Sequence, residues 1–491
     1  MMGEAPPAEW RRSGSCLEGL PAGGENGGGP PVARGAGPLV VEVPEWAPGW
    51  RSRRALSSSG ADGCWVERRE GVQAMESQIQ ELFRVALGLA EPWVVQKVEF
   101  SEERRQLDLW LDFPAGSRFA CPECGREGCG VYDSQERTWR HLNFFEHQTR
   151  LHARQPRIEC PEHGVKTVGV PWARPKVGFT LLMEAFILAL VQSGMTPRQV
   201  GRLMGEHDTR IWRVVQEYVE RARSKADFSG VRAVGVDETS RRKGQEYVTV
   251  FMDLEASRRR VLFVTEGKDA GTVERFRADL EAHGGSAGEV KEACLDMSGA
   301  FMAGLRKEFP EAELTFDNFH LMQLLNDAVD EVRREEQPTH PELKGTRYVW
   351  LKNDWNWTEA QARTFEGLRS SKLATVRASH LKSVFQDLFA EDTVEEAEAM
   401  LKRWYFWATH SRIGPMIRAA KTIKEHWAGV LRWFTSRISN GVLEAINGLI
   451  QSAKAKARGF RSTRYLVTMI YLIAGKLDLK LPALAFATHT K

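Results

Sequence analysis

The stretch "VRAVGVDETS", residues 231–240, joins a short apolar segment to two adjacent acids, Asp237 and Glu238. Valine, alanine and glycine fill most of the first six positions, which is typical of a strand that is buried on both faces. An ionised carboxylate at the end of such a strand is costly unless a partner neutralises it. We therefore expect Asp237, as the residue that ends this strand, either to cap a turn or to face a cation.

The segments that follow predict the sheet to which this strand belongs. Two more strands come after short connections, in "YVTVFMDLE" (247–255) and "RVLFVTEG" (260–267). A helical pattern from about residue 271, a strand in "EVKEACLDMS" (289–298), a second helix and a strand in "AELTFDN" (312–318) come next. Three strands in hairpin order, followed by strands that alternate with helices, indicate a mixed α/β sheet of the ribonuclease H type. Residues 321–477 are patterned almost entirely as helices.

Composition narrows the class of protein without naming a partner. The 491 residues carry 68 Lys and Arg against 65 Asp and Glu, a net charge of +3, so any basic surface must be local. No apolar run approaches the roughly 18 residues of a membrane-spanning helix, and we expect no contact with a membrane. Four of the seven cysteines fall in one narrow window. This spacing favours a metal site in a reducing, cytoplasmic environment over a disulfide framework.

Two matching pentapeptides predict where that metal binds. The segments "CPECG" (121–125) and "CPEHG" (160–164) each place two ligands three positions apart on a tight turn closed by glycine. Four such ligands suit one tetrahedral Zn²⁺ ion, which would be structural because the protein supplies the whole ligand set. The expected ligands are Cys121, Cys124, Cys160 and His163, with Cys129 as a competing ligand.

The segment "TPRQVGRLMGEHDTRIWRVVQEYVERA", residues 196–222, predicts a helix-turn-helix. Thr196 is a favourable N-cap followed by proline at the first helical position. Gly205 falls where the tight turn needs a positive φ angle. A plain helical hairpin in a bundle is the alternative, but the basic exposed face of the second helix favours contact with DNA. That helix would present to a major groove the side chains of Thr209, Arg210 and Arg213.

Three acids that lie far apart in the sequence are candidate ligands for a second metal centre. Asp237 and Asp296 each follow a predicted strand, so they emerge at one edge of the sheet if the first and fourth strands are neighbours. Glu444 lies on a predicted helix in "SNGVLEAINGLIQSAKAKARGF" (439–460). Converging carboxylates repel one another unless divalent cations such as Mg²⁺ or Mn²⁺ neutralise them. Asp317, in "TFDNFH", also follows a strand and is an alternative to Asp296.

A dense basic segment directly follows this helix. The residues expected to contact DNA phosphates are Lys454, Lys456, Arg458 and Arg461, although an ordinary solvated helix face would look similar. Most tryptophans between residues 350 and 433 are expected to pack between helices. The loop "NDWNWT" (353–358) differs, because it is polar and aromatic and is suited to stack on an unpaired base.

Taken in order, these motifs resemble the ISL-three (ISL3) family of bacterial insertion-sequence transposases. The resemblance extends over nearly all of residues 75–477, and its most specific parts are "DNFH" with the helix that follows it and the pattern "SNG-x-x-E-x-x-N". Members of this family are DDE enzymes with a ribonuclease H-like core. The resemblance therefore implies that Asp237, Asp296 and Glu444 form a catalytic, Mg²⁺-binding triad, and that a helical insertion separates Asp296 from Glu444.

Composition and resemblance together divide the chain into segments. Residues 1–74, rich in Gly, Pro, Ser and Arg, are expected to be a disordered tail or an untranslated stretch before Met75. The segments expected after it are a zinc-binding domain (75–178), a helix-turn-helix domain (179–228), the first part of the catalytic core (229–330), a helical insertion (331–435) and the last core helices with Glu444 (436–480).

The function expected from these features is that of a DDE transposase in the bacterial cytoplasm, associated with the nucleoid. It would bind double-stranded DNA at terminal inverted repeats, cleave the strands with divalent metal and transfer the 3′ ends to target DNA. Because two DNA ends must be paired, we expect a homodimer or a higher oligomer. Two alternatives stay open, namely a transposase-derived DNA-binding regulator without catalysis and a resolvase-type nuclease with a ribonuclease H fold.

Overall fold

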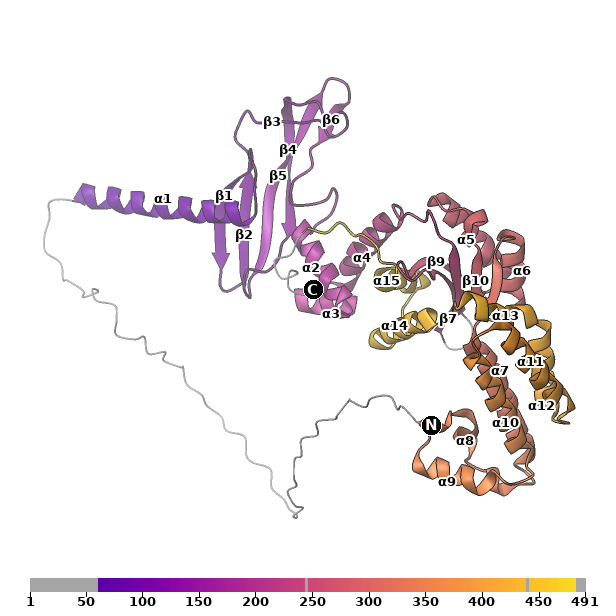
Figure 1. The fold of residues 1–491 in the computed structure, drawn as a ribbon. Coiled ribbons are helices and arrows are strands. Elements are labelled where there is room, and N and C mark those ends of the chain that lie inside the picture. The colour runs from indigo at the N-terminus through magenta and orange to yellow at the C-terminus, as the bar shows by residue number, and fades with distance from the viewer. Residues whose placement is uncertain (1–60, 243–245, 439–440, 483–491) are drawn as a thin grey trace, which may run out of the picture. The chain divides into compact units, whose positions relative to one another are not determined.

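A computed structural model describes residues 61–242, 246–438 and 441–482 (Figure 1). Within these residues, no helix is both long enough and apolar enough to cross a membrane. Helix α1 (Ala61–Ala86) begins before Met75, within the segment that was expected to be a tail. The rest of the predicted N-terminal tail, residues 1–60, lies outside the described residues.

The first module is a six-stranded sheet, as the alternating pattern of residues 93–178 predicts. Its strands follow the order β1-β2-β5-β4-β3, and β6 pairs with β5. Alternate leucines of "QLDLWLDF", such as Leu107 and Leu109, are at most 2% exposed and pack around Trp139 and Leu151. The strands are β1 (Val94–Ser101), β2 (Gln106–Asp112), β3 (Arg118–Phe119), β4 (Cys129–Arg140), β5 (Gln148–Cys160) and β6 (Gly164–Thr167).

Three short helices follow, namely α2 (Leu181–Gln192), α3 (Pro197–Met204) and α4 (Asp208–Arg223). The predicted cap of α3 is confirmed, because Thr196 and Gln199 bond reciprocally in a capping box. Gly205 ends α3 with φ +68°, as predicted. The turn also depends on Gly201, where a Cβ atom would lie 2.6 Å from the carbonyl oxygen of Glu206. These contacts give the turn of the helix-turn-helix.

The second sheet has five strands in the order β11-β10-β7-β8-β9. β7, β8 and β9 are antiparallel, whereas β10 and β11 run parallel to β7. This is the ribonuclease H-like arrangement that the sequence predicts. The strands are β7 (Ala233–Arg242), β8 (Glu246–Asp253), β9 (Arg260–Glu266), β10 (Glu292–Leu295) and β11 (Glu313–Phe316).

One detail of the prediction is wrong, because Asp237 does not end its strand. β7 continues to Arg242, since its hairpin partner β8 still pairs with it at Ser240 and beyond. The parallel neighbour β10 stops earlier, at Leu295. The apolar run therefore ends where β7 loses a neighbour on one side, and Asp237 lies in the open half of a longer strand.

Each face of this sheet is covered by helices. α5 (Ala270–Ala282) and α6 (Gly299–Glu308) cover one face, where Val236, Phe276 and Phe301 are fully buried (Figure 1). On the other face, α14 (Gly441–Ala457) and α15 (Thr463–Ala474) share a continuous apolar core with the helix-turn-helix. The rings of Trp212 on α4 and Tyr465 on α15 stack with centroids 4.1 Å apart. The helix-turn-helix is thus packed onto the core of the sheet.

The region between β11 and α14 is helical, as predicted, and has an apolar core of its own. Trp350 and Trp404 are each 1% exposed within it, which confirms helix packing for these two residues. α7 starts at the edge of the sheet and runs into this region without a break at residue 330. Its helices are α7 (Asn318–Glu336), α8 (Arg347–Leu351), α9 (Glu359–Leu368), α10 (Ala374–Asp387), α11 (Val394–His410), α12 (Gly414–Glu425) and α13 (Trp427–Ser436).

Candidate zinc centre, DNA-binding face and carboxylate site

The two pentapeptides come together at one end of the first sheet. Gly125 and Gly164, with φ of +71° and +64°, turn the backbone at the end of each pentapeptide. Cys124 Sγ lies 3.8 Å from Cys160 Sγ, and Cys160 Sγ lies 3.7 Å from His163 Nδ1. The side chains thus converge on one point.

The spacing of these atoms fits a zinc ion. The ligand atoms of Cys121, Cys124, Cys160 and His163 all lie within 4.8 Å of one another. Tetrahedral Zn²⁺ with Zn–S bonds of about 2.3 Å places neighbouring sulfurs about 3.8 Å apart. Cys129, the competing ligand, lies outside this group, and its thiol donates to the carbonyl of Arg126 at 3.5 Å. The donor set is Cys₃His, as predicted.

Fewer of the side chains predicted to contact DNA are exposed on α4 than the sequence suggests. Thr209 and Arg213 are exposed, as a groove-reading helix requires. Arg210 is instead ion-paired with Glu206, and its guanidinium lies 4.1 Å from the ring centroid of Phe179. Phe179 precedes α2, so only the folded chain brings this ring to Arg210. Of the three predicted side chains, Thr209 and Arg213 are therefore the exposed ones, and the Thr209 hydroxyl is hydrogen-bonded to His207 Nδ1 at 2.9 Å.

The predicted basic segment begins in the last turn of α14, and its side chains divide into two groups. Lys454 Nζ bonds to the carbonyl of Ser240 on β7 and to Gln451, so it joins the helix to the sheet. Lys456, Arg458 and Arg461 are exposed. These three are the cations that this segment leaves at the surface.

Asp237 lies on β7, and Asp296 and Asp317 directly follow β10 and β11, the two strands that run parallel to β7. Cys294 on β10 is paired with Gly235 on β7 and with Thr315 on β11. Two residues after Gly235, Cys294 and Thr315 come Asp237, Asp296 and Asp317. The same register therefore places Asp296 between the other two aspartates. The backbone N–H of Asp317 donates to the carbonyl of Leu295, which continues the pairing toward this edge. Parallel register thus gathers the three side chains at one end of the sheet.

Helix α14 is packed along β7 with matched spacing. A Cβ atom at Gly235 would lie only 2.7 Å from Leu443 Cδ1, so glycine lets the helix approach. Asn447 Nδ2 donates to Asp237 Oδ2 at 2.5 Å, and Gln451 Nε2 donates to Thr239 Oγ1 at 3.0 Å. Two residues of a strand span about 6.6 Å and four residues of a helix about 6 Å, so successive contacts stay aligned.

These contacts involve residues that the sequence did not single out as a group. Gly235 and Gln451 were missed, and Asn447 entered only as the last residue of the pattern SNG-x-x-E-x-x-N. The available signal was a glycine two positions before Asp237 together with the four-residue repeat of Leu443, Asn447 and Gln451 on the helix. Glu444 adjoins this repeat, which places it over the same end of the sheet.

The acids of this edge influence one another electrostatically. Burial raises the pKa of Asp237, and the nearby Asp296 raises it further, whereas His320 and the bond from Asn447 lower it. Burial likewise raises the pKa of Asp317, with Glu444 and Asp237 adding to the rise and His320 opposing it. The structure therefore brings all three predicted acids, the alternative Asp317 and a histidine into one cluster.

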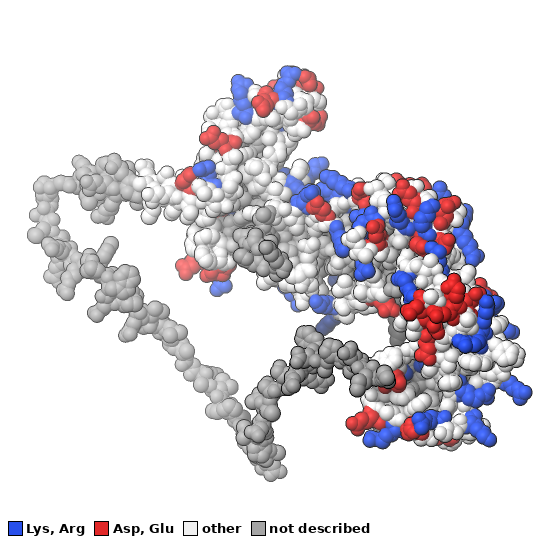
Figure 2. Space-filling model, in the orientation of Figure 1, with Lys and Arg blue, Asp and Glu red and all other residues white. Residues whose placement is uncertain are grey.

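The members of this cluster differ in exposure. Asp317 is 3% exposed, and its Oδ2 atom has no hydrogen-bond partner among the described residues. Asp296 is half-buried and Glu444 is exposed. On the face shown in Figure 2, acidic side chains gather where the α/β core meets the helical region. The cluster is thus open to solvent on the side of Glu444.

Chemically, this donor set suits a hard divalent cation, because carboxylate oxygens are the ligands that Mg²⁺ and Mn²⁺ prefer. In the described part of the chain, only the Cys₃His group has all its ligand atoms within 4.8 Å of one another. Among the described residues, Asp237, Asp296 and Glu444 do not form such a compact group.

Comparison with known proteins matches each module to a transposase. A model of ISL3-type DDE transposases matches residues 234–470, a zinc-finger model of the transposases IS204/IS1001/IS1096/IS1165 matches residues 117–163, and the helix-turn-helix model of transposase family ISL3 matches residues 169–219.

Whole-length relatives agree with these matches. The chain is 27% identical over 431 residues to the transposase of insertion sequence element IS1557 from Mycobacterium tuberculosis, covering 80% of this chain and 94% of the relative. It is 25% identical over 397 residues to the transposase of element IS1001 from Bordetella parapertussis, covering 77% and 95%. Because the zinc finger, the helix-turn-helix and the α/β core all match models of this family and follow one another along the chain, the chain belongs to the ISL3 family of transposases.

Proposed function

We propose that this transposase cleaves the DNA strands at the terminal inverted repeats of its insertion sequence and joins the freed 3′ ends to target DNA. The observation that carries this proposal is the register of β7 with its parallel neighbour β10, which brings Asp237 beside Asp296 just after β10 ends, next to the helix that bears Glu444. Such an edge of carboxylates serves phosphodiester chemistry when it binds a divalent metal.

In this proposal Asp237, Asp296 and Glu444 bind Mg²⁺ or Mn²⁺. Bound metal supplies activation of a water or 3′-hydroxyl and charge stabilisation for the leaving oxygen. Asn447 fixes the orientation of Asp237 through the hydrogen bond that its side-chain amide donates to the carboxylate. Asp317 and His320 are positioning residues, since Asp317 is nearly inaccessible and the neighbouring His320 lowers the pKa of both Asp237 and Asp317.

DNA would be held by two groups of exposed side chains. Thr209 and Arg213 at the start of α4 are available to enter a major groove. Lys456 in the last turn of α14, and Arg458 and Arg461 just beyond it, are available for phosphates. Stacking of Trp212 on Tyr465 supports this arrangement, because it fixes the reading helix relative to the catalytic edge.

The assembly and location follow from the same chemistry. Pairing two transposon ends requires two copies of this site, so we propose a homodimer or a higher oligomer on DNA. Its place of action would be nucleoid DNA in the bacterial cytoplasm, where reduced cysteines retain zinc.

The test is a comparison of binding with cleavage. Glu444→Gln removes the charge at the same size, and we expect it to bind DNA carrying the terminal repeat as the wild type does but to cleave none. The matched control is Glu335→Gln, an exposed acid on α7, which should leave both properties unchanged. Cleavage by Glu444→Gln at the wild-type rate would refute the metal-binding role. A wild-type protein that binds repeat DNA but never cuts it would support the regulator instead.

A further inference from the structure

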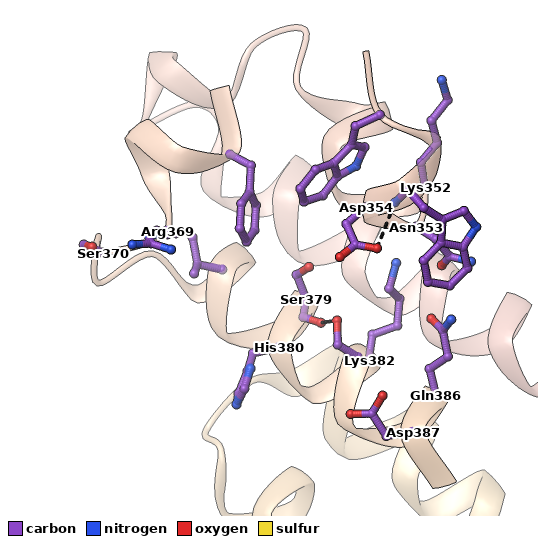
Figure 3. Close-up of a pocket in the computed structure, with 15 residues that line it drawn as sticks. Lys352, Asn353, Asp354, Arg369, Ser370, Ser379, His380, Lys382, Gln386 and Asp387 are labelled. Atoms are coloured by element: carbon purple, nitrogen blue, oxygen red, sulfur yellow. Dashed lines mark hydrogen bonds between the residues drawn. The ribbon is translucent and has the colours of Figure 1, made fainter. Parts of the chain in front are cut away.

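The helical region contains a cavity that the proposed chemistry does not use. Its volume is about 650 Å³, within the range of small-molecule sites. The loop of residues 352–357 forms one wall, and α9 and α10 form the others. Figure 3 shows Asp354, Ser379 and Lys382 pointing toward one another inside it, with Asn353 and Gln386 along one side. Helix α10 supplies seven of the fifteen lining residues, and five come from the aromatic loop and Lys352 before it.

Aromatic surface is unusually accessible at this cavity. Trp355 is 71% exposed, although a tryptophan side chain gains most from burial. Trp357 packs on Phe365 with ring centroids 4.7 Å apart, and its buried indole nitrogen has no hydrogen-bond partner among the described residues. The exposed ring of Trp355 is therefore a flat apolar surface on which a planar ligand can stack.

The polar lining carries charges of both signs and many hydrogen-bonding groups. Lys352 and Arg369 can meet a phosphate, Asp354 and Asp387 can accept from the amino groups of a base, and Asn353, Ser379 and Gln386 supply further donors and acceptors. Lys382 is 3% exposed and donates to the carbonyl of Trp350, and burial lowers its pKa to about 8. A nucleotide combines the features that this lining matches, namely a flat base, a hydrogen-bonding edge and a phosphate.

The cavity also adjoins a second hollow that is lined by Glu444. A second hollow of about 590 Å³ is lined by Glu444 and by Phe319, which is 51% exposed. Lys352, Asn353 and Gln386 line both hollows, so their walls are continuous. A DNA strand at Glu444 therefore lies one shared wall away from Trp355.

From this arrangement we propose that the cavity receives one unpaired nucleotide of the DNA end held at the carboxylate edge, with its base stacked on Trp355. The inference rests on the proposed function and adds a structural feature of its substrate. A paired base cannot enter a side cavity, so the nucleotide must leave the duplex at the cost of its stacking. Stacking on an aromatic side chain offsets this cost and is tolerant of base identity.

The experiment uses two fluorescein-labelled duplexes with the terminal sequence of the element. One is fully paired and the other carries a single unpaired 2-aminopurine beside the cleavage position. Binding is measured by anisotropy for the full-length wild type, Trp355→Ala, Trp355→Phe and Trp407→Ala. Trp407 is the control, because it is 50% exposed on α11 and lines neither hollow.

We expect Trp355→Ala to weaken binding of the unpaired duplex by about 5- to 150-fold and to leave binding of the paired duplex unchanged. Trp355→Phe, which keeps an aromatic ring, should retain most of the wild-type affinity. The wild type should quench the emission of 2-aminopurine, and Trp355→Ala should not. Equal effects on both duplexes, or no effect on either, would overturn the inference. Neither result alters the Glu444→Gln experiment, so the failure of one proposal is distinguishable from the failure of the other.

Discussion

Replacing Gly235 by alanine tests whether the packing of α14 on β7 builds the site. The new Cβ would lie 2.7 Å from Leu443 Cδ1 and 2.9 Å from Leu254 Cδ2. Real Cβ contacts are longer than this, so the helix must move or the leucines must change rotamer. Overpacking of this kind costs about 1–3 kcal/mol. Because Asn447 and Glu444 move with the helix, we also expect DNA cleavage to fall more than DNA binding.

A double-mutant cycle separates this clash from a general loss of stability. Leu443 is 1% exposed, and Leu443→Ala alone should cost about 2–5 kcal/mol through the cavity that it leaves. In the double variant the alanine at 235 occupies part of that cavity and meets no Cδ1 atom. The combined cost should therefore be smaller than the sum of the single costs by about 1 kcal/mol or more, beyond the roughly 0.5 kcal/mol of independent sites.

Chemical denaturation followed by tryptophan fluorescence gives these free energies, and hydrogen exchange of α14 peptides locates the change. Strictly additive costs, with unaltered exchange in α14, would refute the packing of Leu443 against Gly235. Full cleavage by Gly235→Ala would refute the link between that packing and the position of Glu444.

Three further predictions concern the other modules. Cys124→Ser should purify with less than stoichiometric zinc, whereas Cys129→Ser should retain one ion per chain, as metal analysis can establish; zinc loss in both would restore Cys129 as a ligand. Arg213→Ala should weaken binding to repeat DNA by roughly ten-fold or more in anisotropy titrations, since a base or phosphate contact is worth about 1–3 kcal/mol, whereas Arg210→Ala should act chiefly on thermal stability; the reverse order would contradict the assigned faces. Burial, with a smaller contribution from Arg140, lowers the pKa of His141 to about 4 in the folded state. The unfolded chain binds this proton below about pH 6.5 and the folded chain does not, so the free energy of unfolding should fall by up to about 3 kcal/mol between pH 6.5 and 4. His141→Gln should reduce this pH dependence in urea titrations, and an unchanged dependence would exclude His141 as its source.

Features set by short-range sequence were predictable. The zinc pentapeptides, the cap at Thr196 and the positive φ of Gly205 each depend on a few neighbouring residues, and all appear in the structure. The five strands of the core were also predictable, because apolar runs bounded by turns and helices define them locally.

Features set by long-range packing were not predictable in the same way. Asp237 looks like the end of a strand because the apolar run stops there, but the run stops where a parallel neighbour ends. In the sequence, Arg210 looks like a free cation, because Phe179, on whose ring its guanidinium packs, lies in a separate segment. The meeting of Gly235 and Leu443 joins residues more than 200 positions apart, and no local pattern encodes it.

The central claim is that Asp237, Asp296 and Glu444 share divalent metal while a transposon end is bound. The most direct measurement is a crystal structure of the full chain with Mn²⁺ and repeat-ended DNA, in which anomalous scattering locates the ions. We predict manganese within bonding distance of oxygen atoms from all three acids, with Asp317 outside that distance. Manganese bound by Asp317 in place of Asp296, or a Glu444 side chain that remains apart from every ion, would contradict the claim.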